Sequence, residues 1–287
     1  MSDINYFLDT SVLRPFLLGT KTFKSYFEEQ FRNGHVYISL YVLMEFRRSF
    51  IKNVINFYFV LMLDTMETAG DAITFWSNKF KSSEEKAVLQ LVSQIGGNYD
   101  LQDPKQKPAY AREIARYIKR LDSKLRARKQ FQYTGKNETR CNRALIGLTP
   151  MGTTDEEIMD KFRYFNHAFS DVNTCRSRCS VDVFFLDRYR QTVAEMFQYH
   201  EKLQSKSSKA NRGFSKLAER LKNTIESGQD FSCSLCEAVG DIVIAFETSH
   251  HMILQHIDFS FDHICTVAKQ PHQKHPSEQA YISGAAD

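Results

Sequence analysis

Four carboxylates stand beside short apolar segments of this 287-residue sequence, and their side chains suit metal chemistry. Each lies at the end of an apolar run or on the helix expected after one, and the four are Asp9, Glu45, Asp241 and Asp258. Acidic groups gathered at one place repel one another, so such a cluster costs stability unless cations neutralise it. Oxygen ligands are those that Mg²⁺ and Mn²⁺ prefer. The pattern therefore predicts a divalent-metal centre for phosphoryl transfer.

Strands and helices expected near the N-terminus would position the first two acids. Residues 4–9 are predicted to form a buried strand that ends on its acid, and residues 35–39 a second strand. Between them, aromatic residues recur at helical spacing over residues 20–32. A helix over residues 41–60 begins just after the second strand and carries Glu45 in an early turn.

A similar alternation is expected near the C-terminus. Asp241 begins a predicted helical run to about residue 250, and short strands are expected at residues 252–255 and 264–267. From residue 271 onward the chain is polar and is expected to be a loose tail. Strands that alternate with helices predict an α/β fold, with a central parallel sheet flanked by helices. Ligands approach such sheets at the carboxyl ends of their strands, where two of the acids fall.

The long segment between the second and third acids has a different character, because it is highly charged and mostly helical in pattern. Its residues 101–150 hold 13 Lys or Arg against 4 Asp or Glu. The expected organisation is a core built from residues 1–64 and 232–270, a large basic and mostly α-helical insertion at residues 65–231, and a polar C-terminal tail at residues 271–287.

One predicted helix, over residues 110–129, concentrates the positive charge of this insertion. Its basic residues are Arg112, Arg116, Lys119, Arg120, Lys124, Arg126 and Arg128. Charge runs are commonly solvated surface faces, but clustered Lys and Arg also neutralise phosphates and release counterions, and we expect this helix to bind nucleic acid. The aromatic residues that interleave with the charges either stack on unpaired bases or fill the core, and they are Tyr110, Tyr117, Phe131 and Tyr133. A basic loop is expected over residues 205–213.

Two close pairs of cysteines form a second metal-ligand pattern. They are Cys175 with Cys179 and Cys233 with Cys236, which together match a Cys₄ structural zinc site. The alternative is that all four are buried free thiols. The histidines near the C-terminus, at residues 250–251, 272 and 275, are also metal-ligand types, and we expect surface or tail positions for them.

The amino-acid composition predicts a folded protein without a membrane-spanning segment. Apolar residues make up 42% of the chain and charged residues 25%, which allows a sizeable core and excludes global disorder. The apolar run at residues 57–63 is too short to span a bilayer, and the polar N-terminus has no signal-peptide pattern. A cytoplasmic protein without a membrane partner is expected, with cysteines that are reduced or bound to metal.

Around the four acids, the sequence resembles the PIN-domain nucleases. Residues 6–13 (YFLDTSVL) are similar to the opening motif of that family, an apolar strand followed by Asp, a small residue and a hydroxyl residue. Residues 38–45 (ISLYVLME) resemble its second motif, and residues 240–245 (GDIVIA) its third. Residues 256–261 (HIDFSF) resemble the fourth, in which Asp is followed three residues later by Phe. The resemblance covers roughly residues 1–60 and 232–270.

The resemblance implies a PIN-like parallel sheet with four acids around one or two Mg²⁺ or Mn²⁺ ions. Asp9, Glu45, Asp241 and Asp258 would bind metal directly or through water, and Ser11 would orient Asp9 or the scissile phosphate. Bound metal lowers the pKa of a water molecule, and a second ion stabilises the leaving oxygen. The chain departs from the family at His256, where Thr or Ser is usual, and in the length of the insertion.

The resemblance, together with the basic insertion, implies a metal-dependent endoribonuclease, and analogy alone extends this to a bacterial toxin or defence effector. Two alternatives stay open. One is a catalytically silent PIN-like scaffold that binds nucleic acid or protein, which His256 and the insertion favour. The other is a DNA-directed nuclease, because the same acids serve both polymers. A homodimer and a regulatory protein partner are further expectations from the resemblance.

Overall fold

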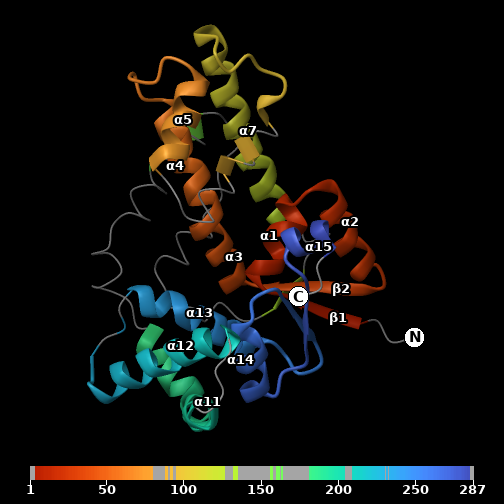
Figure 1. The fold of residues 1–287 in the computed structure, drawn as a ribbon, viewed down its shortest axis with the longest axis vertical. Coiled ribbons are helices and arrows are strands. Elements are labelled where there is room, and N and C mark those ends of the chain that lie inside the picture. Colours follow the sequence, from red (N-terminus) through yellow and green to blue (C-terminus); the bar gives the residue numbers. More distant parts are fainter. Residues whose placement is uncertain are drawn as a thin grey trace. The chain divides into compact units, whose positions relative to one another are not determined.

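A parallel sheet stands at the centre of the fold (Figure 1). Four of its strands lie in the order β2-β1-β4-β5, and every neighbouring pair is parallel. They are β1 (Ile4–Leu8), β2 (Gly34–Ser39), β4 (Ile253–His256) and β5 (His272–Lys274). A three-residue strand, β3 (Gln132–Thr134), pairs with β2 and adds a fifth strand at that side. The predicted α/β fold with a parallel sheet flanked by helices is therefore confirmed.

The computed structural model describes most of the chain and divides it into two compact units. The first unit contains Met1–Leu43, Phe131–Ala144 and Val172–Asp287, and the second Met44–Gln130 and Leu145–Asp171. The residues described are 4–79, 88–89, 91–92, 95–126, 132–134, 156–157, 160–161, 163, 181–203, 209–229, 231 and 233–284.

The central strand β1 shows why an apolar run forms a strand here. Its residue Phe7 lies opposite Tyr37 of β2 on one side and Leu254 of β4 on the other. Phe7 and the next residue, Leu8, are fully buried, as expected for a strand that is covered on both faces of a parallel sheet. Because Leu8 is level with Gln255, the carboxyl ends of β1 and β4 meet at the same edge.

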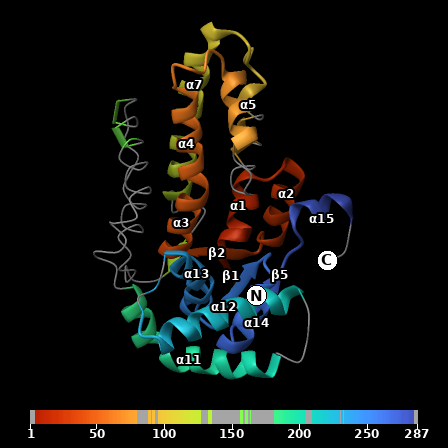
Figure 2. The same ribbon diagram turned by 60° about the vertical axis from the view of Figure 1, so that its left-hand side comes forward.

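Helices cover both faces of the sheet in this first unit (Figure 2). One face carries α1 (Thr10–Leu18), α2 (Lys21–Gln30) and α15 (Glu278–Ser283). The other carries α11 (Val181–Leu203), α12 (Lys209–Glu226), α13 (Cys233–Glu247) and α14 (Ser260–Ala268). On that face α14 packs against α11, α12 and α13, so these four helices form one layer.

The regular elements described in the second unit are all helices. Helix α3 (Leu40–Phe46) enters it and continues through the π-helical segment η1 (Arg47–Ile51) into α4 (Lys52–Leu61), where a single helix over residues 41–60 is predicted. Helix α4 packs against α5 (Ala69–Lys79) and against α7 (Lys107–Arg126), which follows the short 3₁₀-helix η2 (Pro104–Gln106). A mostly helical middle region is therefore confirmed.

Several local predictions are wrong. Residues 264–267 lie inside helix α14 and are not a strand, because the apolar positions 261, 264 and 265 are spaced to bury one helical face. Residues 271–283 are not a loose tail, since β5 joins the sheet and α15 begins at an N-cap, Ser277. Helix α12 begins at Lys209, which makes residues 209–213 helical instead of a loop.

The two compact units also differ from the sequence blocks expected for a core and an insertion. Residues 44–61 belong to the second unit, although the first expected core block extends to residue 64. Helices α11 and α12 belong to the unit that contains the sheet, although the expected insertion includes them. Helices α11 and α12 belong to the unit with the sheet because they pack on α13 and α14.

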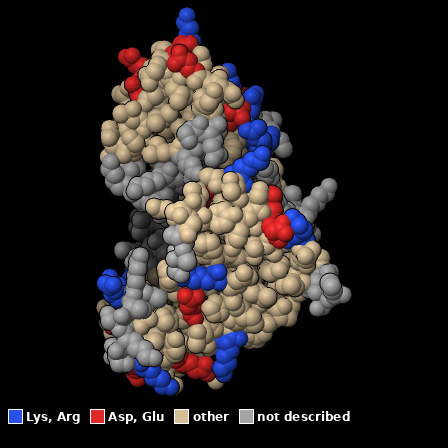
Figure 3. Space-filling model, turned by 45° about the vertical axis from the view of Figure 1, so that its right-hand side comes forward, with Lys and Arg blue, Asp and Glu red and all other residues tan. Residues whose placement is uncertain are grey.

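Charges of both signs occur on the face of the molecule drawn in Figure 3. On the described residues of the face drawn in Figure 3, Lys and Arg side chains are interspersed with Asp and Glu. In the described part of the chain, no helix combines the length and the apolar character needed to cross a membrane.

Substitution of Gly34, at the start of β2, tests the register between β1 and β2. A Cβ atom there would overlap the carbonyl oxygen of Ile4 and approach the ring of Tyr6 to 2.5 Å. We expect Gly34→Ala to lower the free energy of unfolding by about 1–3 kcal/mol, measured by urea denaturation. Gly213 on α12 is the matched control because a Cβ there meets nothing within 4 Å, so Gly213→Ala should stabilise the helix. Equal stabilities for the two variants would contradict the β1–β2 register.

Candidate functional site

Asp9 lies at the carboxyl end of β1 and is almost fully buried, with 2% of its surface exposed. It is the N-cap of α1, and one carboxylate oxygen, Oδ2, accepts a hydrogen bond of 2.8 Å from the backbone N–H of Ser11. A helix N-terminus favours negative charge, and a bond from a backbone N–H to a carboxylate is charge-assisted. The local fold therefore provides interactions that favour a carboxylate in this buried position.

Two hydrogen bonds connect this turn to the segment that follows β4. The backbone N–H of Asp9 donates to the carbonyl oxygen of Gln255 at 3.0 Å. The backbone N–H of Ile257 donates to the hydroxyl oxygen of Ser11 at 3.0 Å. Ser11 thus holds the start of α1 against the residue that precedes Asp258. The structure places Asp9, Ser11 and Asp258 at the same edge of the sheet.

Asp258 is exposed as a residue, but its carboxyl group is partly surrounded by protein. This desolvation raises the pKa of the Asp258 carboxyl group above its usual value, and the charge of Arg14 on α1 acts in the opposite direction. An arginine from α1 therefore favours the ionised carboxylate at this edge. Its guanidinium is also of the type that binds phosphate oxygens.

The third predicted acid, Asp241, is half-buried within α13, which begins at Cys233 and not at Asp241 itself. The preceding Gly240 allows a close approach to α3, since a Cβ there would lie 2.9 Å from the ring of Tyr41. The Tyr41 hydroxyl donates to the carbonyl oxygen of Cys236 at 3.4 Å. The second predicted acid, Glu45, is half-buried on α3 and belongs to the second compact unit.

The acids of the first unit do not form a tight cluster. Among the described residues, one group of at least three His, Cys, Asp or Glu side chains has its ligand atoms all within 4.8 Å of one another. That group is His256, Asp262 and His272, and it contains none of the four predicted acids. The structure therefore brings no three of the four predicted acids within 4.8 Å of one another among the residues it describes.

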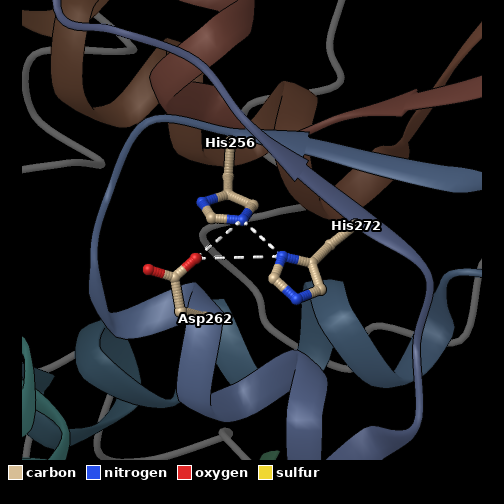
Figure 4. Close-up of side chains that lie close together, drawn as sticks. All are labelled: His256, Asp262 and His272. Carbon is tan, nitrogen blue, oxygen red and sulfur yellow. Dashed lines mark hydrogen bonds and ion pairs between the residues drawn. The ribbon is translucent and has the colours of Figure 1, made fainter. Parts of the chain in front are cut away.

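His256, the residue at which the sequence departs from the motif pattern that it resembles, is the last residue of β4 and is fully buried (Figure 4). Its Nδ1 lies 3.0 Å from the carbonyl oxygen of Asp258, and its Nε2 lies 2.9 Å from Nδ1 of His272. Asp262 Oδ1 is 3.5 Å from His256 Nε2 and 3.8 Å from His272 Nδ1. Figure 4 shows the three side chains directed toward one another.

The protonation state of His256 follows from these surroundings. Burial, and then the neighbouring His272, lower the pKa of His256 to about 3, so the ring is neutral at neutral pH. A carbonyl oxygen can only accept a hydrogen bond, so the bond to Asp258 requires that Nδ1 carry the proton. The Nε2 atom is then the one with a lone pair, and it faces His272 and Asp262.

The side chains of the predicted Cys₄ zinc site lie mostly outside the described residues. Cys175 and Cys179 are not among them, and nothing is described of the side chain of Cys233 at the start of α13. Cys236 is half-buried and forms no disulfide. Cys265, which has no role in that prediction, is buried in α14, and burial followed by the charges of Asp262 and Asp9 raises the pKa of its thiol.

The basic helix α7 has a clear division between its faces. Its apolar side is buried in the second unit, through Tyr110, Ala111, Ile114, Ile118, Leu121 and Leu125. Arg112, Arg116 and Arg120 are exposed, and the last two form ion pairs with Glu113. Nothing is described of the side chains of Lys124 and Arg126, and Arg128 is outside the described residues.

The aromatic residues near this helix are only partly suited to base stacking. Tyr110 is fully buried, and its hydroxyl donates to the carbonyl oxygen of Val92 at 3.2 Å, so it is a core residue. Tyr117 is half-buried on the same helix. Phe131 is outside the described residues, and nothing is described of the side chain of Tyr133 in β3. For Tyr110, the structure therefore selects core packing from the two alternatives left open by the sequence.

Sequence reasoning missed the group formed by His256, Asp262 and His272. In the sequence, His256 is identified only as a departure from a motif and His272 as part of a tail, and Asp262 has no assigned role. The three residues come together through the sheet topology, because β5 follows α14 in the chain and pairs with β4.

Comparisons of the chain with protein-family models, with curated proteins and with solved protein structures find no match.

Proposed function

We propose that the chain is a divalent-metal-dependent nuclease of PIN type that hydrolyses phosphodiester bonds, with RNA as its substrate. The observation that carries the proposal is the edge shared by β1 and β4, where Asp9, Ser11 and Asp258 come together. The resemblance to the four PIN motifs requires this adjacency of the first and fourth motifs. It is not implied by their positions in the sequence, which lie about 250 residues apart.

The donor atoms of the predicted acids suit a hard divalent cation. Carboxylate oxygens from Asp9, Asp241 and Asp258 are ligands that Mg²⁺ and Mn²⁺ prefer, and Mg²⁺ commonly keeps several waters between itself and the protein. A separation of the acids beyond 4.8 Å is therefore compatible with binding that is partly water-mediated. A bound ion would supply a water of lowered pKa and stabilise charge on the phosphate.

In this proposal, the side chains at the edge of β1 and β4 have different roles. Asp9 and Asp258 provide fixed negative charge on the two neighbouring strands. Ser11 holds the two strand ends in register through its bond from Ile257. Arg14 favours the ionised form of Asp258 and offers a cation to a phosphate oxygen.

The preference for RNA rests on the resemblance and on the exposed basic row of α7. Arg112, Arg116 and Arg120 are spaced by four residues, so they follow one face of the helix. Their charges would neutralise phosphates without reading sequence. The ion pairs with Glu113 weaken this surface, because a bound phosphate must compete with the carboxylate.

One observation favours a second candidate, a catalytically silent PIN-like scaffold that binds nucleic acid or protein. His256 is buried and bonded to Asp258 and His272 where the family has a hydroxyl residue, so its ring is turned into the protein. A side chain in that position does not present a hydroxyl to substrate.

A cleavage assay distinguishes these functions. The purified chain is incubated with single-stranded RNA, structured RNA and DNA, each with Mg²⁺, with Mn²⁺ or with a chelator. We expect RNA to be cut only when metal is present. Cleavage of DNA alone would identify a DNA-directed nuclease. Binding of nucleic acid without cleavage of any substrate would favour the scaffold.

A further inference from the structure

A group of three potential metal ligands lies beside the acids of the proposed nuclease site but shares no residue with them. His256 ends β4, Asp262 lies in the first turn of α14, and His272 begins β5. Their ligand atoms all lie within 4.8 Å of one another. Figure 4 shows that the atoms face a common point from three different elements.

The separations of the three ligand atoms match the size of a transition-metal ion. They are 2.9 Å between the two imidazole nitrogens and 3.5 and 3.8 Å from these nitrogens to the carboxylate oxygen. Ligands bound at 2.0–2.1 Å around a tetrahedral zinc ion are separated by about 3.3 Å. The observed distances scatter around this value, so an ion needs only small side-chain movements to enter.

The ligand types select zinc or a similar ion over magnesium. Imidazole nitrogens suit Zn²⁺ and related transition metals, whereas Mg²⁺ takes oxygen ligands and waters in an octahedral arrangement. Two histidines and one carboxylate are also a set found where zinc keeps a fourth position open for water. The group is therefore chemically distinct from the carboxylates at the sheet edge.

The surroundings of His256 orient it as a metal ligand. Its Nδ1–H donates to the carbonyl oxygen of Asp258, which directs the lone pair of Nε2 toward the other two side chains. Metal-binding histidines commonly make this kind of bond to a backbone carbonyl through their second nitrogen. Phe261 stacks on the ring with centroids 5.4 Å apart, which further limits its rotation.

Asp262 lacks the partners that usually neutralise an acid. Among the described residues, it forms no ion pair with a lysine or arginine, and the basic groups within 4 Å of it are the two imidazoles. The ammonium of Lys274 packs on the ring of Phe259, 3.0 Å from its centroid. A divalent cation between Asp262 and the imidazoles would supply the missing positive charge.

We propose that His256, Asp262 and His272 form a binding site for one Zn²⁺ ion, with a water molecule at the fourth position. His256 is fully buried, while the side chains of Asp262 and His272 keep 36% and 29% of their surfaces exposed, so the open position faces solvent. The ion would connect β4, α14 and β5 and so fix residues 257–261, which carry Asp258. The site does not depend on nuclease activity.

Zinc binding to the full-length protein tests the proposal directly. The protein is treated with a chelator, and Zn²⁺ is then titrated by calorimetry, with metal content measured after dialysis. We expect His272→Ala and Asp262→Ala to weaken this binding more than about 100-fold, beyond the loss typical of outer-sphere partners. Both residues are partly exposed, so circular dichroism should show folded variants. Wild-type protein that binds no zinc would overturn the proposal.

Two controls separate this site from other zinc ligands. His251→Ala changes an exposed histidine outside the group and should leave the affinity unchanged. Cys236→Ser removes one member of the predicted cysteine site and should also leave this binding unchanged. Co²⁺ bound in place of zinc should lack the intense near-ultraviolet charge-transfer band of thiolate ligands. A thiolate band with unchanged affinity in His272→Ala would assign the metal to cysteines and refute the histidine site.

Discussion

Substitution of Asp9 by asparagine should lower kcat/KM for metal-dependent RNA cleavage by at least about 1000-fold, which corresponds to about 4 kcal/mol of transition-state stabilisation. Asparagine has nearly the same shape, but it removes the negative charge that would hold the cation at the end of β1. Single-turnover cleavage at saturating Mn²⁺ measures the loss of chemistry separately from any loss of substrate binding.

The same substitution should leave the fold intact, because asparagine is as good an N-cap as aspartate. The amide oxygen can still accept the hydrogen bond from the Ser11 backbone, so we expect the free energy of unfolding to change by no more than about 1 kcal/mol. Asp64→Asn is the matched control, since Asp64 is exposed just after α4. Asp9→Asn protein that cleaves RNA at the wild-type rate would rule out the proposed role of Asp9.

The sheet could be predicted closely because its strands are specified by short-range patterns. Strand β1 ends one residue before the predicted limit, and β2 and β4 are each within one residue of theirs. In each strand the residues at the carboxyl end are buried, and a helix begins within four residues of that end. The same logic gave the correct edge of the sheet for Asp9 and Asp258, since the ends of adjacent parallel strands must coincide.

The errors have a common cause, which is that local sequence does not show pairing over long distances. The apolar residues at 264–267 fit a strand or a helix equally well, and packing on α11, α12 and α13 selects the helix. Strand β5 is polar in sequence and is a strand because it pairs with the exposed edge of β4. The histidine group depends on that pairing, so it could not be predicted once residues 271–287 were interpreted as a tail.

His275 shows how far this segment is integrated into the fold. It is 1% exposed, its Nε2 lies 2.7 Å from the side-chain oxygen of Gln255, and its Nδ1 lies 2.9 Å from the hydroxyl of Tyr26. The amide oxygen of Gln255 can only accept, so Nε2 carries the proton and Nδ1 accepts from Tyr26. The neutral ring thus has both nitrogens satisfied, and burial lowers the pKa of His275 to about 4.

We expect this depressed pKa to make the protein less stable in mild acid. Below about pH 6.5 the unfolded chain binds a proton at His275 and the folded chain does not, so the free energy of unfolding falls as the pH falls. The loss continues until the pH reaches about 4, where the native ring is also protonated, and it totals roughly 3 kcal/mol. His256, whose pKa is lowered to about 3, acts with the same sign.

Urea denaturation in the presence of a chelator, at pH values between 7.5 and 4, measures this effect. His275→Gln removes the titrating imidazole, so the free energy of unfolding should fall less between pH 6.5 and 4 than it does in the wild type. The variant should also be less stable than the wild type at pH 7.5, because it loses hydrogen bonds of the imidazole. His251→Gln is the matched control, because it makes the same substitution at an exposed histidine outside this hydrogen-bond network. If His275→Gln keeps the full wild-type loss between pH 6.5 and 4, the buried neutral state of His275 is not its cause. The other described histidines with a lowered pKa, His256 and His263, would then be the next residues to substitute.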